Sequence, residues 1–334
     1  MRYKATFTVI LFCFITSLLF FNYPIGTAEA KSDTAKIVIW TAGEDYRNDF
    51  YLNKLKEKFP NYTFVLEYMN SSTIAAKIMG EKLNTQCDIV LSEEYGYLEM
   101  CSEYLAELPD FKYSLFMPEI IPQNKKYTPE LRNGGAVMLN KAVLEKKGVP
   151  IPKSYSDLLK PEYKNLVIMP NPKSSGTGYM FLRQLTNEWG ENEAFKFFEA
   201  LTENILQYTS SGSGPVNALV QGEAAIGLGM TAQAVTEINK GAKLDIVFFK
   251  EGSPYSMYGN AIIKNKADKK GVKEVFNYLS VDLCKENNNL FFPEQVFKNY
   301  TPTIKNYPTK IHYGNMKNNT LQEKERLLKK WMFS

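Results

Sequence analysis

The stretch Met169–Leu182 reads MPNPKSSGTGYMFL and contains the residues that decide the fold. An apolar run, Leu166 to Met169, predicts a buried strand, and the prolines after it predict a turn. Small hydroxyl residues then precede a run with helical spacing, Gly178 to Trp189. A turn of this kind directs backbone N–H groups and hydroxyls into one space at the positive end of a helix dipole. The stretch therefore predicts a strand–turn–helix unit that binds an anion or a highly oxygenated solute.

A second stretch repeats this pattern. The residues TSSGSGP at 209–215 follow a strand-like run, Asn204 to Tyr208, and precede a helical run, Val216 to Gly222. Either turn alone could be an ordinary helix cap. Two of them in one alternating α/β chain favour a binding role. The candidate ligand-binding residues in the two turns are Ser174, Ser175, Gly176, Thr177, Ser210, Ser211, Gly212 and Ser213.

The N-terminal part of the chain predicts a parallel sheet. Strands are expected at Lys36 to Thr41, Thr63 to Tyr68 and Cys87 to Leu91. A helix is expected at Asp49 to Phe59, and a second one, capped by SST at 71–73, continues through Lys82. Ligands of such sheets lie beyond the carboxyl ends of the strands. Short polar residues fall at these ends, and the candidates there are Thr41, Ser71, Ser72 and Ser92.

A second α/β set follows, and two strands are expected to join it to the first. Gly134 to Leu139 predicts a strand that leaves the first lobe, and Tyr258 to Ile263 predicts one that returns. Between them, Ala224 to Leu228 predicts another strand, which makes Thr231 a candidate at its end. Tyr255 either stacks on the ligand or packs at the hinge.

These runs predict two lobes and their boundaries. Residues 36–132 and about 260–290 form lobe 1, and residues 136–255 form lobe 2. Residues 291–334 are expected to pack on the body through C-terminal helices, on lobe 2, including an amphipathic helix from Leu321 to Trp331.

The first thirty residues predict export. Arg2 and Lys4 precede an apolar run, Val9 to Phe21, and AEA at 28–30 matches the small-x-small pattern before a cleavage site. The apolar run is shorter than the roughly 20 residues of a membrane span. We expect cleavage after Ala30 and a soluble periplasmic protein; the alternative is a retained N-terminal anchor helix.

Composition and cysteine content exclude several classes of protein. The net charge is +4 with both signs interspersed, which does not indicate nucleic-acid binding. Cys87, Cys101 and Cys284 follow the expected cleavage site and lack C-x-x-C spacing. Either Cys87 and Cys101 form a disulfide, or all three are separate buried thiols.

The residues needed for most enzyme chemistry are absent. His312 is the only histidine, and there is no G-x-S-x-G, Walker or G-x-G-x-x-G motif. These absences argue against a Ser-His-Asp hydrolase and exclude a histidine or paired-cysteine zinc site. A carboxylate enzyme stays open as an alternative, and its candidate acids are Glu44, Asp45, Glu93 and Glu94.

The region from about Tyr127 to Lys264 resembles the family 1 extracellular solute-binding proteins of ABC importers. The motifs that carry the resemblance are NGG at 133–135, VPIPKSYSDLL at 149–159, PEYK at 161–164, PKSSGTGY at 172–179, QYTSSGS at 207–213, QGEAAIG at 221–227 and EGSPY at 251–255. They are similar to those of the subgroup for ferric iron, hexose phosphate and 2-aminoethylphosphonate.

The resemblance implies a type II periplasmic-binding-protein fold, with two α/β lobes and a hinge of two crossing strands. It implies no catalysis and no cofactor, only binding of a small solute for an ABC permease and its ATPase at the inner membrane. We expect a monomer.

The ligand is expected to be a phosphorylated sugar or a phosphonate. Iron-binding relatives carry two adjacent tyrosines after the strand matching GEAAIGL, where this chain has GMTA at 229–232. A ferric iron-binding protein remains the alternative, because clustered phenolates suit this hard ion. Its candidate ligands here are Tyr95, Tyr97, Tyr255 and Tyr258.

Overall fold

The computed structural model describes residues 35–43, 45–300 and 303–333. The expected signal segment and its cleavage after Ala30 lie outside the described residues, as does Glu44. Within the described ranges, no helix is both long and apolar enough to cross a membrane.

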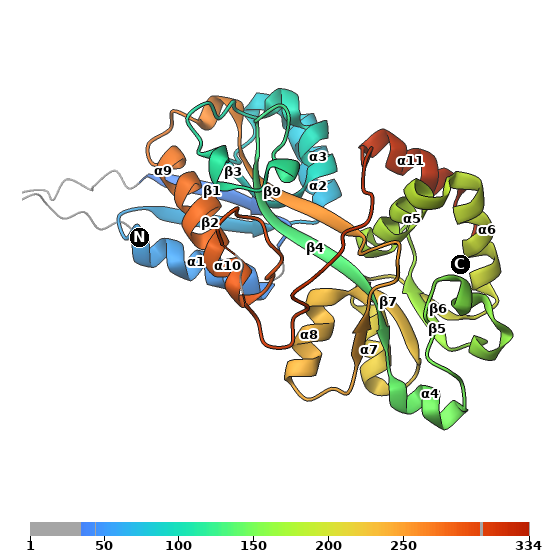
Figure 1. The fold of residues 1–334 in the computed structure, drawn as a ribbon. Helices are drawn as coiled ribbons and strands as arrows, with labels where there is room; N and C mark the ends of the chain where they lie inside the picture. The colour runs from blue at the N-terminus through green and yellow to red at the C-terminus, as the bar shows by residue number, and fades with distance from the viewer. Residues whose placement is uncertain (1–34, 44, 301–302, 334) are drawn as a thin grey trace, which may run out of the picture. The chain divides into compact units, whose positions relative to one another are not determined.

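One mixed sheet runs through the described chain, in the order β2-β1-β3-β9-β4-β7-β5-β6, with β8 pairing to β4 (Figure 1). Its strands are β1 Lys36–Thr41, β2 Thr63–Tyr68, β3 Ile89–Glu94, β4 Thr128–Leu139, β5 Val167–Pro170, β6 Ile205–Thr209, β7 Ile226–Met230, β8 Asp245–Val247 and β9 Tyr255–Ile262.

Strand β4 joins the two halves of this sheet. Its residues Thr128 to Gly134 pair antiparallel with β9, and Gly135 to Leu139 pair antiparallel with β7. The first half consists of β1, β2, β3 and β9 with the start of β4, and the second consists of β5 to β8 with its end. Strands β4 and β9 therefore run side by side between the halves, as Figure 1 shows.

Helices cover both halves. The α-helices are α1 Asp45–Lys58, α2 Ser71–Glu81, α3 Tyr95–Met100, α4 Lys141–Lys147, α5 Gly176–Trp189, α6 Glu191–Thr202, α7 Gly214–Gln221, α8 Thr231–Asn239, α9 Val272–Asn277, α10 Cys284–Leu290 and α11 Leu321–Lys330. Short 3-10 segments are η1 Lys82–Asn84, η2 Ser102–Tyr104, η3 Tyr113–Leu115, η4 Pro118–Ile120, η5 Ser156–Leu159, η6 Pro161–Tyr163 and η7 Lys264–Lys266, and a π-helical segment, η8 Tyr278–Leu283, links α9 to α10.

The first half departs from the sequence prediction at several helix and strand ends. Helix α1 begins at Asp45 instead of Asp49, and strand β4 begins at Thr128 instead of Gly134. The cap of α2 is Asn70, whose side chain accepts a hydrogen bond from the Thr73 N–H; the cap predicted at residues 71–73 is one residue too late. Strand β3 continues to Glu94 instead of ending at Leu91. Ser92 adopts a φ of +56° within an irregularity of the β3–β9 pairing between Val90 and Glu93, and the pairing resumes at Glu93 and Glu94.

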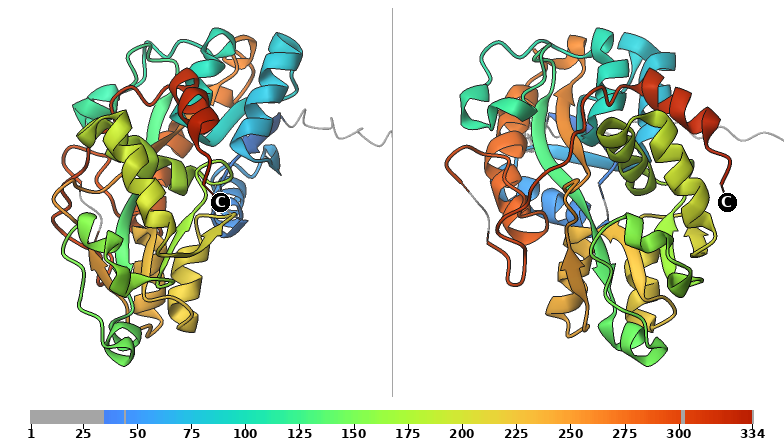
Figure 2. Two further views of the ribbon diagram at one scale, coloured as in Figure 1. Left: turned by 90° about the vertical axis from the view of Figure 1, so that its right-hand side faces the viewer. Right: turned by 45° about the vertical axis from the view of Figure 1, so that its right-hand side comes forward.

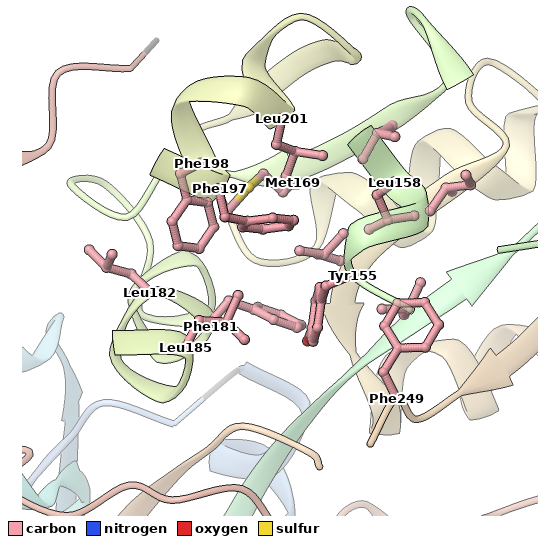
Figure 3. Close-up of a cluster of buried hydrophobic side chains, with 14 of the residues drawn as sticks. Tyr155, Leu158, Met169, Phe181, Leu182, Leu185, Phe197, Phe198, Leu201 and Phe249 are labelled. Atoms are coloured by element: carbon pink, nitrogen blue, oxygen red, sulfur yellow. The ribbon is translucent and has the colours of Figure 1, made fainter. Parts of the chain in front are cut away.

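The second half has a large aromatic and aliphatic core. Phe181 and Leu185 of α5 pack with Phe198 of α6 and with Tyr155, all at most 2% exposed (Figure 3). Trp331, which follows α11, is fully buried in the same core. This packing fixes the position of the N-terminus of α5, at the start of which the SSGTG residues lie.

The segment after α10 contacts β4 at the junction between the two halves and then packs on the second half. Glu294 accepts hydrogen bonds from the Gly134 N–H (3.0 Å) and from the hydroxyls of Tyr307 (2.7 Å) and Tyr313 (2.8 Å). Farther along, Arg183 of α5 pairs with Glu323 of α11 at 2.8 Å. Both views in Figure 2 place α11 beside α5 and α6. Among the described residues of 291–333, α11 is the one α-helix, where the sequence predicted several.

The three cysteines of the described chain, Cys87, Cys101 and Cys284, are free and buried. The alternative of three separate thiols therefore holds, and the Cys87–Cys101 disulfide does not form.

Candidate functional site

The two hydroxyl-rich turns leave the same edge of the sheet. Strands β5 and β6 are parallel, with Pro170 opposite Thr209, and the Asn171 N–H donates to the Thr209 carbonyl at 2.8 Å. We call residues 171–177 the first turn and residues 209–214 the second turn. A Cβ on Gly212 would collide with Thr177 Oγ1, so the turns are in contact.

The first turn ends in the cap of α5. Ser175 is the N-cap, and its hydroxyl accepts a long hydrogen bond of 3.5 Å from the Gly178 N–H. The next N–H groups, of Gly176 and Thr177, have no partner within a helix because they belong to its first turn. Gly178 is required here, since a Cβ on it would lie 2.8 Å from Pro172 N and even closer to the Pro170 carbonyl.

These groups open onto a cavity of about 410 Å³, called here the first cavity. It is lined from both halves of the sheet, and its lining residues are Asn70, Ser71, Ser72, Glu94, Tyr97, Pro172, Lys173, Ser174, Ser175, Gly176, Tyr179, Ser256, Tyr258, Lys324 and Leu328. Five candidates from the sequence therefore meet in one place: Ser71, Ser72, Ser174, Ser175 and Gly176.

Among the described residues that line the first cavity, Tyr179 alone has a buried side-chain polar atom, its hydroxyl oxygen, without a hydrogen-bond partner. Tyr179 is only 3% exposed, and its hydroxyl has no hydrogen-bond partner among the described residues. Burial raises the pKa of this phenol, which keeps it protonated and able to donate. A buried donor without an acceptor is costly, by roughly 1–3 kcal/mol. A ligand oxygen in the cavity would remove that cost.

Two lysines bring positive charge to the first cavity. Lys173 lies in the first turn and is exposed. Lys324 comes from α11, and its ammonium lies 5.2 Å from the ring centroid of Tyr97 and 5.1 Å from that of Tyr179. These are cation–π distances.

Two carboxyl groups lie on the opposite wall. Glu94 lines the first cavity; burial raises its pKa, and the positive charge of Lys324 lowers it again in part. Glu93, directly behind, is 2% exposed, and burial raises its pKa to about 8. The nearby Ser71 hydroxyl opposes that rise, while the charge of Glu94 adds to it. At neutral pH the wall therefore carries less negative charge than two free glutamates would.

The second turn is organised differently. The Thr209 hydroxyl donates to the Ser211 carbonyl at 2.9 Å, and the Ser211 and Ser213 hydroxyls are 3.0 Å apart. Ser213 lines a second cavity of about 550 Å³, whose other lining residues are Tyr46, Met230, Ala232, Gln233, Thr236, Lys240, Leu290, Phe291 and Phe292. Ser210, Ser211 and Gly212 line neither cavity.

The remaining strand-end candidates face the protein interior. Thr41 donates to Asn48 at 2.9 Å, and Ser92 donates to Glu130 at 2.7 Å. Thr231 is fully buried, and its hydroxyl has no hydrogen-bond partner within the described part of the chain. None of the three lines the first or the second cavity.

Ser92 belongs to a buried polar network. Glu130 also accepts hydrogen bonds from Arg47 at 2.6 Å and from Tyr51 at 2.7 Å. Arg47 and Glu130 were not predicted from the sequence, because they lie 83 residues apart and no local pattern links them.

The four tyrosines considered for iron do not converge. Tyr97 and Tyr258 line the first cavity, whereas the Tyr95 hydroxyl donates to the Ile120 carbonyl at 2.9 Å. The guanidinium of Arg132 lies over the Tyr255 ring, with its carbon 4.9 Å from the ring centroid. Burial raises the pKa values of Tyr95 and Tyr97, which opposes the phenolate form that iron requires. No group of three or more His, Cys, Asp or Glu side chains suited to a metal ion occurs in the described ranges.

Sequence reasoning also missed Lys324 and Tyr179 as cavity residues. Tyr179 lies four residues after Ser175, the N-cap of α5, and its N–H donates to the Ser175 carbonyl, so the i, i+4 spacing could have indicated it. Lys324 lies about 150 residues away along the chain from the first turn. No local signal distinguishes it from the other lysines of α11.

A family model described as a bacterial extracellular solute-binding protein matches residues 95–300. The chain belongs to this family. It is a solute-binding protein of an ABC importer and not an enzyme, so the carboxylate-enzyme alternative is wrong. Proteins of this family are periplasmic, bind small solutes and act with a permease and an ATPase.

Curated relatives extend along most of the solute-binding protein. An uncharacterized protein of Haemophilus influenzae is 29% identical over 332 residues, which cover 92% of each chain. A spermidine/putrescine-binding periplasmic protein of Escherichia coli is 26% identical over 270 residues, covering 76% of each chain.

Solved structures confirm the type II periplasmic-binding-protein fold. AfuA of Actinobacillus pleuropneumoniae, with fructose-6-phosphate bound, superposes with a TM-score of 0.75 at 24% identity and covers 89% of this chain and 97% of its own. Iron-bound HitA of Pseudomonas aeruginosa gives 0.71 at 16% identity, with 82% and 90% covered. These likenesses concern the fold.

Proposed function

We propose that this solute-binding protein captures a small anionic solute, such as a phosphorylated sugar or a phosphonate, in the first cavity. The observation that carries the proposal is the N-terminus of α5, which opens onto this cavity beside the buried, unpartnered Tyr179 hydroxyl. A helix N-terminus favours negative charge, and the Tyr179 hydroxyl supplies a further donor.

The charges around the cavity support an anion. Lys173 and Lys324 line it together with one acid, Glu94, and Glu93 behind it holds a proton at neutral pH, because its pKa is about 8. The ligand's anionic group would lie against Ser175 and Gly176, and its neutral hydroxyls would reach Ser71 and Ser72 on the opposite wall.

The binding step would be lobe closure. We propose that residues 36–132 with about 260–290 move as lobe 1 and that residues 136–255 move as lobe 2, with 291–334 carried mainly by lobe 2. Strand β4 would bend between Gly134 and Gly135, where its pairing partner changes from β9 to β7. Strand β9 would bend beside it, near Tyr255, which pairs with Gly134. The exported protein, cleaved after Ala30, would act as a monomer and present its closed form to an inner-membrane permease.

Titration calorimetry of the exported protein tests the ligand class. The panel comprises fructose 6-phosphate, 2-aminoethylphosphonate, inorganic phosphate and ferric citrate. An organic phosphate or phosphonate should bind and should also raise the melting temperature by mass action. Binding of ferric citrate alone would contradict the proposal.

The iron alternative rests on Tyr97 and Tyr258, which both line the first cavity. It predicts that Tyr258→Phe abolishes ferric iron binding. It predicts the same for Tyr255→Phe if Tyr255 is also an iron ligand. The anion proposal predicts that both variants bind the organic anion within about threefold of the parent.

A further inference from the structure

Lys324 lies on a helix that is attached to the second half of the protein. Its helix, α11, is anchored by Arg183 to Glu323 at 2.8 Å and by Arg326 to Glu191 at 2.6 Å. Leu327 and Trp331 are fully buried on the same side. The backbone position of Lys324 is therefore set by α11, and its ammonium reaches from there to the rings of Tyr97 and Tyr179.

The surroundings of this ammonium are those of a site for an organic cation. Two rings, of Tyr97 and Tyr179, lie within 5.2 Å of the nitrogen, and the Glu94 carboxyl faces the same cavity. Aromatic faces with a nearby carboxylate are the usual recognition elements for amines. Tyr97 and Glu94 come from the first half of the sheet, so the lysine reaches across the cavity to them.

We propose that Lys324 occupies an ammonium subsite of the solute cavity and thereby selects against solutes whose only charged groups are amines, such as diamines and polyamines. The inference rests on the proposed function, because it takes the first cavity to be the solute site. The chain's own cation fills the place that a solute amine would take and turns the net charge of the cavity toward anions. This is specificity through an occupied competing site, in addition to attraction of the correct ligand.

Replacing Lys324 should expose the subsite. Lys324→Ala and Lys324→Met remove the ammonium, and the methionine keeps much of the apolar stem in case alanine disturbs the packing of α11. The probes are putrescine and spermidine, measured by titration calorimetry on the full exported chain. Lys329→Ala is the matched control, since Lys329 lies on the same helix and is exposed.

The parent and Lys329→Ala should bind the amines at least tenfold more weakly than either Lys324 variant. Adding Glu94→Gln to Lys324→Ala should remove the gain, because an amine bound in this subsite needs the carboxylate. Equal amine affinity in parent and Lys324 variants would overturn the inference, and so would a gain that survives Glu94→Gln.

The organic anions are titrated in the same experiment. A parent that binds no anion while Lys324→Ala gains amines would refute the proposed function and leave the subsite intact. A parent that binds an anion while both Lys324 variants gain no amine would refute the subsite alone.

Discussion

The first and second turns contain nearly the same sequence, SSGT at 174–177 and SSGS at 210–213, yet they have different surroundings in the structure. The first, residues 171–177, presents Ser174, Ser175 and Gly176 to a cavity that both halves of the sheet line. The hydroxyls of the second, residues 209–214, mostly bond within the turn. The two turns are in contact, since Gly212 lies against Thr177.

The two turns differ in what faces them, and on the proposed function these surroundings decide which turn binds the solute. Across from the first turn lie Ser71 and Glu94, and Lys324 enters from α11. Across from Ser213 lie mainly apolar groups, among them Phe291 and Phe292. The second turn supports the first from behind, through the absence of a side chain at Gly212.

The largest expected effect is a loss of stability as pH rises. It comes from Glu93 behind the first cavity, whereas no acid lines the second cavity. The ordinary pKa of 4.5 is raised to about 8 in the folded protein. Between these values the folded state holds a proton that the unfolded state releases, so stability falls as pH rises, by roughly 1.4 kcal/mol per pH unit. Urea unfolding between pH 5 and pH 8 measures this.

Glu93→Gln should remove most of that decline and make the protein more stable than the parent at pH 8. Glu103→Gln, at an exposed position, is the control and should leave the decline unchanged. A parental pH profile retained in Glu93→Gln would show that Glu93 ionises normally in the fold.

The next effect separates the two turns by affinity. Ser175→Ala removes a hydroxyl of the first cavity that we propose contacts the ligand, and a hydrogen bond to a charged group contributes about 1.5–3 kcal/mol. Affinity for the organic anion should therefore fall roughly tenfold to a hundredfold. Ser211→Ala, in the second turn, should change it less than about threefold.

Calorimetric titration of both variants makes the comparison, with melting temperatures recorded as well. Ser175→Ala should also lose about 1 kcal/mol of stability, because Ser175 caps α5. Equal losses of affinity in the two variants would mean that both turns bind the solute, against the distinction drawn between them.

The smallest effect concerns the shape of the first turn. Gly178→Ala places a methyl group against the Pro170 carbonyl and Pro172 N, and should cost about 1–3 kcal/mol of stability. Gly176→Ala is the matched control, since no heavy atom outside its own helix and chain neighbours lies within 4 Å of its Cβ position. Chemical denaturation should separate the two variants by at least about 1 kcal/mol; equal stabilities would contradict the tight packing of this turn.

Much of the fold could be predicted because local patterns determine it. Strands β1 and β2 occur where the apolar runs KIVIWT and TFVLEY predict them. The predicted end of strand β3, at Leu91, is three residues too early, because Ser92 and the two acids after it resemble a polar strand end. A hydrogen bond to Glu130, 38 residues away, holds Ser92 in the sheet, and no local pattern contains that partner.

The candidate site was predictable to the same extent. Ser71 and Ser175 flank strand ends, where short polar residues are recognisable from the sequence. Thr41 has the same local signal but turns inward to Asn48, since only the packing of α1 decides between the two directions. Lys324 and Glu94 meet through tertiary structure, so their proximity could not be read from either segment alone.

Native mass spectrometry with metal analysis, on exported protein purified without refolding, tests the central claim most directly. The first cavity should retain a small organic anion, seen as a discrete mass increase that Ser175→Ala diminishes and Ser211→Ala preserves, with no stoichiometric iron. One iron per chain with no organic anion would contradict the account.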